Sequence, residues 1–277
     1  MNHQPIILIT GCSSGIGRAC AEGMARRGWR VIASARRNED VRALQDAGFE
    51  SVLIDLASSH SVIEGAAKVL GMTQGRINAV FLNAGYGQAG AVEDLSRPAL
   101  REQFETNVFG TIELANQLIP AMRRAKRGRI VINTSVLGFV ALRYRGAYNA
   151  SKYALEGFAD TLRLELHGTG IEVSLIEPGP ILSRFRANSL KAFHRHVRAE
   201  SSPHREVYQQ QLARLNTEGS AVPFTLGPEA VMPKLVHACE AHRPRIRYPV
   251  TVPSHLFAWL KRILPAGWLD RILLTIG

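Results

Sequence analysis

Three polar side chains occur at a spacing that suits proton transfer to or from a substrate oxygen. Tyr148 and Lys152 are four residues apart, and Ser135 lies 13 residues before the tyrosine. Positions i and i+4 share one face of a helix, so the Lys152 ammonium can lie close to the phenol and favour the phenolate. A free tyrosine has a pKa near ~10, so proton transfer near neutral pH needs a pKa lower by about 3 units, or roughly 4 kcal/mol. The pattern predicts a proton shuttle, and the alternative is a surface pair without function.

A glycine-rich loop lies far upstream of these residues. Gly11, Gly15 and Gly17 follow the apolar run Ile6–Ile9 and stand where a helix is expected to begin. The N–H groups and the dipole of a helix N-terminus attract a pyrophosphate, so the loop predicts a dinucleotide cofactor. The spacing Thr-Gly-x-x-x-Gly-x-Gly differs from the G-x-G-x-x-G pattern. Other loop residues expected to contact the cofactor are Ser13, Ser14 and Ile16.

The end of the second expected strand indicates which cofactor is bound. An NAD site needs a carboxylate about 20 residues past the glycines to bind the ribose 2′-OH. Here the strand ends in Ala33-Ser34-Ala35-Arg36-Arg37, which has no acidic residue. Arginine offers a fork of donors to a 2′-phosphate, which a carboxylate would repel. The sequence therefore predicts NADP(H), with Ser34 and Arg36 as first candidates and Arg37 as the second. Alternatively, both arginines only face solvent.

The order of these motifs resembles that of the short-chain dehydrogenase/reductase family. The chain carries, in order, the glycine loop, Asn83-Ala84-Gly85, Asn107, Ser135, the Tyr148/Lys152 pair and Pro178-Gly179. The resemblance covers residues 5 to about 180 with specific motifs, and residues 181 to 277 only loosely. The loop, the end of the second strand and the Glu-Pro-Gly-Pro-Ile segment are most similar to the branch with NADP-dependent aldehyde reductases, retinol dehydrogenases and hydroxysteroid dehydrogenases.

The resemblance implies a role for each catalytic residue. Ser135 would polarise the substrate oxygen and Tyr148 would transfer its proton. Lys152 would lower the pKa of the tyrosine and hold the nicotinamide ribose. Asn107 would bend a helix and anchor water that links Lys152 to solvent, although an asparagine inside a helix is more often a packing residue.

The resemblance also implies further cofactor contacts. Asp55, which precedes Leu56, would bind the adenine amino group. In Asn83-Ala84-Gly85 the asparagine would brace the sheet, and the small residues would let the cofactor pass closely. Leu82 stands where the family usually has another asparagine, and Ser183 where it usually has threonine. The residues implied to lie at the nicotinamide are Pro178, Gly179, Ile181 and Ser183.

Strand and helix patterns alternate along the chain without a linker or an internal repeat. This alternation predicts βαβ crossovers and a single α/β domain over 1–277, with a doubly wound, mostly parallel sheet of the Rossmann type. Ser96 can cap a long helix that Pro98 opens. The expected strands are Ile6–Ile9, Arg30–Ala35, Ser51–Ile54, Ile77–Leu82, Arg129–Asn133, Ile171–Ile176 and an edge strand at Arg245–Val250.

Residues 183–222 are charged and helical in pattern, which predicts a segment that covers the substrate. Its histidines, His194, His196 and His204, have no carboxylate or cysteine at ligand spacing, so no metal site is expected. The candidates for the substrate pocket are mostly apolar and indicate a lipophilic carbonyl or alcohol, although each could instead belong to the core. These candidates are Tyr86, Phe139, Leu142, Tyr144, Phe185 and Phe193.

The C-terminal extension, 251–277, carries an amphipathic pattern. Leu256, Leu260 and Ile263 follow at i, i+4 and i+7, with two tryptophans and basic residues nearby. Charged residues interrupt every apolar run of spanning length, so the segment cannot cross a bilayer. Packing of 255–277 against the pocket or another subunit is the favoured interpretation, and contact with a membrane surface is the alternative.

Composition limits the other classes of function. The net charge of +11 and a pI near 10.1 suit nucleic-acid binding, but the arginines are dispersed and no binding motif accompanies them. Cys12, Cys20 and Cys239 lack metal-ligand spacing, and an odd number without a signal peptide predicts a reduced, cytoplasmic setting. Cys12, inside the glycine loop, is expected to be a small filler beside the cofactor.

Together these features predict an NADP(H)-dependent oxidoreductase that reduces a lipophilic aldehyde or ketone to an alcohol. One alternative is a retinol or hydroxysteroid dehydrogenase that works in the oxidative direction. Another is a non-catalytic NADP(H) sensor, which the retained Ser135, Tyr148 and Lys152 disfavour. As in similar enzymes, a homodimer or homotetramer is expected through the helices Pro98–Arg123 and Tyr148–His167.

Overall fold

The computed structural model describes residues 4–216, 219 and 222–276. Within them a seven-stranded sheet has the order β3-β2-β1-β4-β5-β6-β7, and every neighbouring pair of strands is parallel. The predicted doubly wound parallel sheet is therefore confirmed. The strands are β1 (Ile6–Ile9), β2 (Arg30–Ala35), β3 (Glu50–Leu53), β4 (Ala79–Leu82), β5 (Gly128–Asn133), β6 (Ile171–Glu177) and β7 (Arg247–Pro249).

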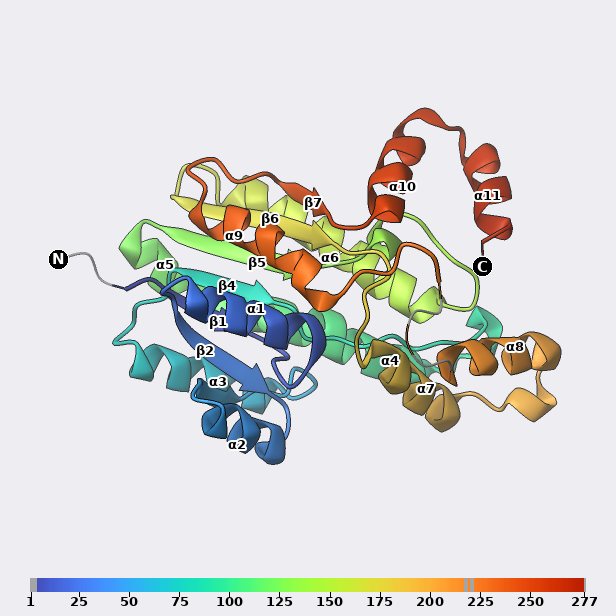
Figure 1. The fold of residues 1–277 in the computed structure, drawn as a ribbon, viewed down its shortest axis with the longest axis horizontal. Coiled ribbons are helices and arrows are strands. Elements are labelled where there is room, and N and C mark those ends of the chain that lie inside the picture. Colours follow the sequence, from blue (N-terminus) through green and yellow to red (C-terminus); the bar gives the residue numbers. More distant parts are fainter. Residues whose placement is uncertain (1–3, 217–218, 220–221, 277) are drawn as a thin grey trace.

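Helices cover both faces of the sheet (Figure 1). The apolar cluster on one face joins the strands to α1 (Gly15–Arg26), α2 (Asn38–Asp46) and α9 (Met232–Glu240). The cluster on the other face joins them to α3 (Ser59–Met72), α5 (Gly110–Ala125) and α6 (Gly146–Glu165). Short 3-10 turns lie at Val92–Asp94, Val136–Gly138, Ala199–Ser201 and Pro228–Val231.

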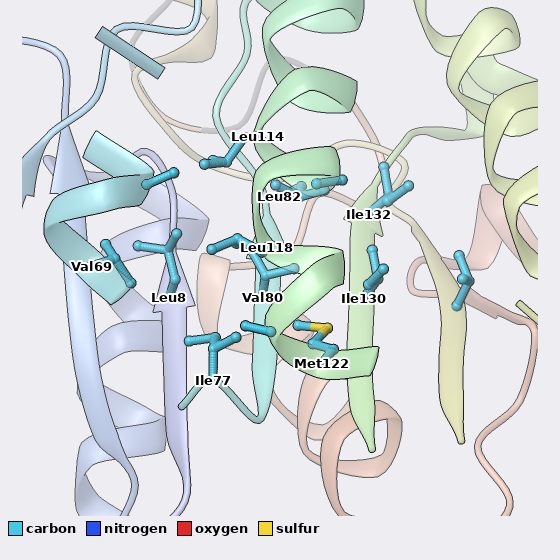
Figure 2. Packing of buried hydrophobic residues seen from close by; sticks show 14 of the residues in the cluster. Leu8, Val69, Ile77, Val80, Leu82, Leu114, Leu118, Met122, Ile130 and Ile132 are labelled. Carbon is cyan, nitrogen blue, oxygen red and sulfur yellow. The ribbon is translucent and has the colours of Figure 1, made fainter. Parts of the chain in front are cut away.

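The apolar run of β1 is explained by burial on both faces of the sheet. Leu8 faces the layer of α3 and α5, Ile7 faces the layer of α1, and both side chains are 0% exposed. Figure 2 shows the first of these layers, in which Leu118 and Met122 of α5 lie over Val80 and Ile130 of the central strands. The core thus holds the carboxyl ends of the strands in fixed register.

The strand order reverses between β1 and β4, which is where an open α/β sheet usually forms a ligand crevice. Figure 1 shows four further helices beyond the ends to which the strand arrows point. They surround the edge of the sheet where the predicted chemistry lies. These helices are α7 (Phe185–His196), α8 (Arg205–Asn216), α10 (Val252–Ile263) and α11 (Ala266–Leu274).

The long helix expected before β5 is divided into parts. Ser96 caps α4 (Arg97–Phe104) by accepting a hydrogen bond from the Ala99 N–H. A π-helical segment, Glu105–Phe109, then connects α4 to α5 and contains Asn107. The regular helix is thus interrupted at Asn107, where the bend was expected. At the edge of the sheet β7 is shorter than the predicted strand Arg245–Val250.

Candidate active site

The glycine loop between β1 and α1 has the backbone shape that a pyrophosphate needs. Gly11 and Gly15 adopt positive φ angles of 74° and 58°, which favour glycine. A Cβ on Gly17 would lie 2.3 Å from the Gly11 carbonyl oxygen, so no larger residue fits there. Ser14 precedes the first turn of α1 without a side-chain capping bond, and Ser13 is exposed. The backbone N–H groups at this helix N-terminus can therefore bind an anion.

A chain of hydrogen bonds ties the glycine loop to the catalytic lysine. The Asn83 amide donates to the Thr10 carbonyl at 2.9 Å, and the Asn133 amide donates to Asn83 Oδ1 at 2.9 Å. The Asn133 carbonyl accepts a bond of 2.7 Å from Lys152 Nζ. Asn83 thus braces β1, β4 and β5, as predicted. Beside it, a Cβ on Gly85 would lie 3.0 Å from Asn107 Oδ1, which shows how closely the backbone passes there.

The three candidates for binding the 2′-phosphate, at the end of β2, differ in their exposure and in their partners. Arg36 is exposed, and the ion pairs recorded among the described residues do not include it. Arg37 instead pairs with Asp40 at 2.8 Å. Ser34 is 1% exposed, and its hydroxyl has no hydrogen-bond partner in the described part of the chain. Its contact with a phosphate stays a prediction.

The loop after β3 holds the two residues assigned to the adenine end. Asp55 is half-buried, and its Oδ1 accepts a hydrogen bond of 3.1 Å from the Ala57 N–H. Leu56 is buried, and its carbonyl lies against Gly110, where a Cβ would come within 1.9 Å. The adenine contact of Asp55 stays a prediction.

The three expected catalytic side chains converge although they come from two elements. Ser135 begins the turn after β5, whereas Tyr148 and Lys152 lie on the first turns of α6. Lys152 Nζ is 5.8 Å from the centroid of the Tyr148 ring, and the Ser135 hydroxyl lies close enough to the phenol to lower its pKa. All three are buried, with exposures of 7%, 9% and 5% for Ser135, Tyr148 and Lys152. The group is poised to exchange a proton with an oxygen placed between the two hydroxyls.

The pKa of Tyr148 differs from the expectation. Burial raises it to about 12, and the Ser135 hydroxyl and the charge of Arg145 offset this only in part. Burial also lowers the pKa of Lys152 to about 8, against the opposing effect of the Glu156 carboxylate. The net shift is opposite to the expected lowering, because desolvation of the phenolate outweighs the Ser135 hydroxyl and the Arg145 charge. A lowering by Lys152 in the presence of the cofactor stays a prediction.

Asn107 lies next to this group, but its hydrogen bonds among the described residues are to Tyr86 and Ser151 and not to Lys152. Its Nδ2 donates to the Tyr86 carbonyl at 2.9 Å and to Ser151 Oγ at 3.0 Å, while its Oδ1 accepts from the Tyr86 N–H at 3.1 Å. With 1% exposure it is a positioning residue that holds the segment after β4 against α6. The predicted water link between Asn107 and Lys152 stays a prediction.

The segment after β6 completes the wall between the catalytic serine and the glycine loop. The Pro178 carbonyl accepts hydrogen bonds from the Val136 N–H at 2.8 Å and from Ser135 Oγ at 3.4 Å. Ser183 lies at the other end, where its Cβ would be 3.0 Å from a Cβ on Gly15. Pro178, Gly179, Ile181 and Ser183 all belong to this segment, and their contacts with the nicotinamide stay predictions.

Three of the six candidate pocket residues lie near Tyr148. The Phe185 ring packs edge-on against Tyr148 with centroids 5.2 Å apart, and it also contacts Gly87, next to Tyr86. Phe139 and Leu142 belong to the same apolar cluster. Two of the others, Tyr144 and Phe193, lie instead in a separate cluster with Tyr208, which agrees with the alternative that they belong to a core. Tyr86 is not among the residues of either cluster and stays a candidate for the pocket.

Two of the three histidines of the predicted cover, His196 and His204, pair with carboxylates. His196 Nε2 lies 2.9 Å from Glu102, and His204 Nε2 lies 2.5 Å from Glu93. These pairs and the buried Tyr208 fasten α7 and α8 to the body. The described residues contain no group of three or more His, Cys, Asp or Glu that could hold a metal. The covering role of 183–222 stays a prediction, and 217–218 and 220–221 lie outside the described residues.

A buried acidic cluster behind Lys152 did not emerge from the sequence. Arg247 of β7 lies 3.1 Å from Glu156 Oε2 and 3.3 Å from Glu177 Oε1. Burial, with repulsion from Glu156, raises the pKa of Glu177 to about 8. The available signal was the i+4 spacing of Glu156 from Lys152, which places its charge on the same helix face.

All three cysteines are free and buried, and burial raises the pKa of Cys12 to about 12, which fits the role of a filler.

The C-terminal helices pack against the enzyme. Phe257 of α10 is buried against the cluster of Tyr148, as the favoured packing interpretation predicts. No helix among the described residues combines the length and apolar character needed to cross a membrane.

Comparison with known proteins decides the family. The profile described as short chain dehydrogenase matches residues 5–193. This chain belongs to the short-chain dehydrogenase/reductase family. It is 43% identical over 271 residues to the uncharacterized oxidoreductase YbbO of Escherichia coli strain K12, with 98% of this chain and 94% of the relative covered. It is 30% identical to retinol dehydrogenase 8 of Homo sapiens, covering 94% of this chain and 86% of the relative.

Solved structures agree with this assignment. A short-chain dehydrogenase/reductase from Burkholderia phymatum, solved in complex with NAD, matches with a TM-score of 0.77 and 26% identity over 94% of this chain and 92% of that one. The family and the shared fold establish an oxidoreductase that acts on CH–OH or C=O groups with a nicotinamide cofactor.

Proposed function

We propose that this enzyme uses NADPH to reduce a lipophilic aldehyde or ketone to the alcohol through Ser135, Tyr148 and Lys152. The observation that carries the proposal is their convergence in one buried group beside the glycine loop. A sensor without turnover would not need this group, because binding a dinucleotide requires only the loop and the strand ends.

The protein groups suit the reductive direction. Because burial raises the pKa of Tyr148 to about 12, the phenol is protonated at neutral pH and can donate to a carbonyl oxygen. Ser135 would bind the same oxygen. Once the proton has moved, the Lys152 ammonium, 5.8 Å from the ring centroid, would stabilise the phenolate. Bound NADPH would supply the hydride to the carbonyl carbon.

The end of β2 supports NADP(H) over NAD(H). Ala35 ends the strand without a carboxylate, and the exposed Arg36 follows it outside the recorded ion pairs of the described residues. A guanidinium there would bind a 2′-phosphate, whereas Arg37 is already paired with Asp40. Arg36→Asp should weaken NADPH binding by at least about tenfold and leave NADH binding much less affected. Equal losses for the two cofactors would contradict this choice, and Arg42→Asp on the exposed side of α2 is the control.

The apolar surroundings of Tyr148 support a lipophilic substrate. Phe139, Leu142, Phe185 and Phe257 share one cluster with it, so few polar groups are available to bind a sugar or an acid. The 30% identity with retinol dehydrogenase 8 favours a second candidate, oxidation of a retinoid alcohol with NADP. The two candidates differ in direction and in substrate, and one assay distinguishes them.

The test is NADPH oxidation measured across aliphatic aldehydes of increasing length, retinal, ketosteroids and quinones, with the reverse reaction measured on the matching alcohols. Tyr148→Phe should abolish turnover and keep NADPH binding, because it removes only the transferable proton. Tyr153→Phe, on the same helix and 40% exposed, is the matched control and should keep full activity. If Tyr148→Phe retained activity within about tenfold of wild type, this mechanism would be refuted.

We also propose that the enzyme forms a homodimer or homotetramer through α4, α5 and α6. The π-helical segment between α4 and α5 carries the exposed Phe109, and α6 carries the exposed Phe158 and Leu164, with exposures of 51%, 46% and 67%. Leu164→Glu should dissociate the assembly in light scattering, whereas a wild-type protein that is monomeric at micromolar concentration would contradict the proposal.

A further inference from the structure

The last two helices expose an unusual amount of apolar surface. α10 and α11 form a hairpin that projects from the body in Figure 1. On α10 the exposed residues follow at i, i+4, i+7 and i+11, which places them on one helix face. The exposed apolar residues of the hairpin and its end are Val252 (57%), Leu256 (48%), Trp259 (60%), Ile263 (51%), Trp268 (63%), Leu274 (56%) and Ile276 (52%).

This surface is distinct from the face that holds the hairpin to the enzyme. Phe257 is buried, and Leu260, Leu269, Ile272 and Leu273 pack against the same cluster. That cluster includes Tyr148, so the inner face of the hairpin forms part of the apolar surroundings of the catalytic tyrosine. The exposed residues of α10, which form an outer row of Val252, Leu256, Trp259 and Ile263, take no part in this packing. Their exposure therefore needs a separate explanation.

The charges on the hairpin indicate what covers the outer row. Lys261, Arg262 and Arg271 are basic, Asp270 is the single acidic residue of 251–276, and the whole chain has a net charge of +11. Lys261 Nζ lies 5.0 Å from the centroid of the Tyr153 ring, so its charge stays beside an exposed aromatic. Basic residues beside exposed tryptophans suit the headgroup region of an anionic bilayer.

A second copy of this chain fits the same surface less well. In a twofold dimer the same patch occurs on both sides, so the basic residues of one hairpin would face those of the other. Such an interface would bury like charges with one carboxylate per hairpin to offset them. An anionic lipid surface has the opposite charge and accepts the tryptophan rings at its boundary.

We propose that the α10–α11 hairpin docks the enzyme on an anionic bilayer surface, with Trp259, Ile263 and Trp268 inserted at the headgroup boundary. The hairpin lies on the surface and does not span it. The docked position places the Tyr148 cluster next to the lipid, from which a membrane-dissolved carbonyl substrate enters. The docking stands on the hairpin alone, whereas this route of entry rests on the proposed function.

The experiment measures binding of the full chain to vesicles by co-sedimentation and tryptophan fluorescence. Vesicles of phosphatidylcholine are compared with vesicles that also contain phosphatidylglycerol. Wild type should bind the anionic vesicles at least about tenfold more strongly, with a blue-shifted emission and with binding that weakens as salt is added. Trp29 is buried, so the change in emission reports Trp259 and Trp268.

Matched variants test the location of the contact. Ile263→Ser should weaken vesicle binding several-fold, whereas Ile63→Ser, on α3 with a similar exposure of 46%, should not change it. The double variant Trp259→Ser with Trp268→Ser should lower binding by at least about tenfold. Its thermal midpoint and NADPH affinity should stay at the wild-type values, which shows that the fold is intact.

Two outcomes overturn the proposal. One is a wild type that does not bind anionic vesicles, or that binds them as well when both tryptophans are replaced. The other is a double variant whose assembly becomes smaller in light scattering while its vesicle binding is unchanged. The hairpin surface would then bind a second copy of this chain and not a membrane. A chain that binds vesicles through the hairpin but reduces no lipophilic carbonyl would refute the proposed function and leave the docking intact.

Discussion

The buried ammonium of Lys152 should cost the protein stability. Burial lowers the pKa of this lysine from 10.5 to about 8, which corresponds to roughly 3 kcal/mol at 1.36 kcal/mol per unit. Methionine has a similar length and helix propensity but carries no charge. Loss of the hydrogen bond to the Asn133 carbonyl offsets about 1 kcal/mol. Lys152→Met is therefore expected to raise the free energy of unfolding by about 2 kcal/mol at pH 7, while turnover is lost.

The difference in unfolding free energy between Lys152→Met and the wild type should change with pH in a defined direction. Below pH 8 Lys152 is charged in the folded and unfolded chains, so the full cost of burial is present. Between pH 8 and 10.5 the unfolded chain binds more protons than the folded one, and the wild type becomes more stable relative to the variant as pH rises. The advantage of Lys152→Met should therefore shrink over this range. Above pH 10.5 the lost hydrogen bond should leave the variant the less stable protein.

Urea unfolding at pH 7, 8, 9 and 10, followed by fluorescence, measures this difference. Lys68→Met, at an exposed position of α3, is the matched control and should show no change of difference with pH. The reasoning is refuted if Lys152→Met is no more stable than wild type at pH 7, or if the difference stays constant up to pH 10. Equal slopes against urea in all three proteins confirm that the same surface is exposed on unfolding.

Three further experiments test the packing of the core, the glycine loop and the burial of the cysteines. Leu118→Ala, at a fully buried position of α5, should lower the free energy of unfolding by about 2–5 kcal/mol in urea titrations, and a loss below 1 kcal/mol would contradict the assigned core. Gly17→Ala should weaken NADPH binding at least about tenfold in fluorescence titrations, because its Cβ would lie 2.3 Å from the Gly11 carbonyl; unchanged affinity would show that the loop can relax. The three buried cysteines should react with a thiol reagent at least about a hundredfold more slowly in the folded than in the unfolded protein, since burial raises their pKa values, and a fast-reacting Cys12 would disprove its role as a filler.

The sequence predicted the sheet because its signals are local. A run such as Ile6–Ile9 is apolar at every position, which suits a strand covered on both faces, and the glycine loop then marks the turn into α1. The right-handed crossover connection limits how such units can stack, so the parallel order followed. The pairing of Tyr148 with Lys152 was predictable for the same reason, since the helix repeat alone puts i and i+4 on one face.

The tertiary structure decided which groups meet and how they titrate. The pKa of Tyr148 is raised because Phe185 and Phe257, from distant segments, help to exclude water around it, and no spacing in the sequence contains that information. The assignment of Phe193 to a different cluster depends likewise on the direction in which α7 leaves the sheet. Arg247 reaches Glu177 only because β7 adds to the edge of β6.

The α10–α11 hairpin shows both contributions. The sequence indicated an amphipathic helix and grouped Leu256, Leu260 and Ile263 in one apolar stripe, but the structure divides this stripe between an inner and an outer face. Whether Leu260 or Leu256 faces the enzyme could not be predicted, because both are apolar and either could have packed inward. Contacts with the Tyr148 cluster selected Leu260 and left Leu256 48% exposed. Spacing along one element is set by the covalent chain, but burial is set by whatever other element lies against it.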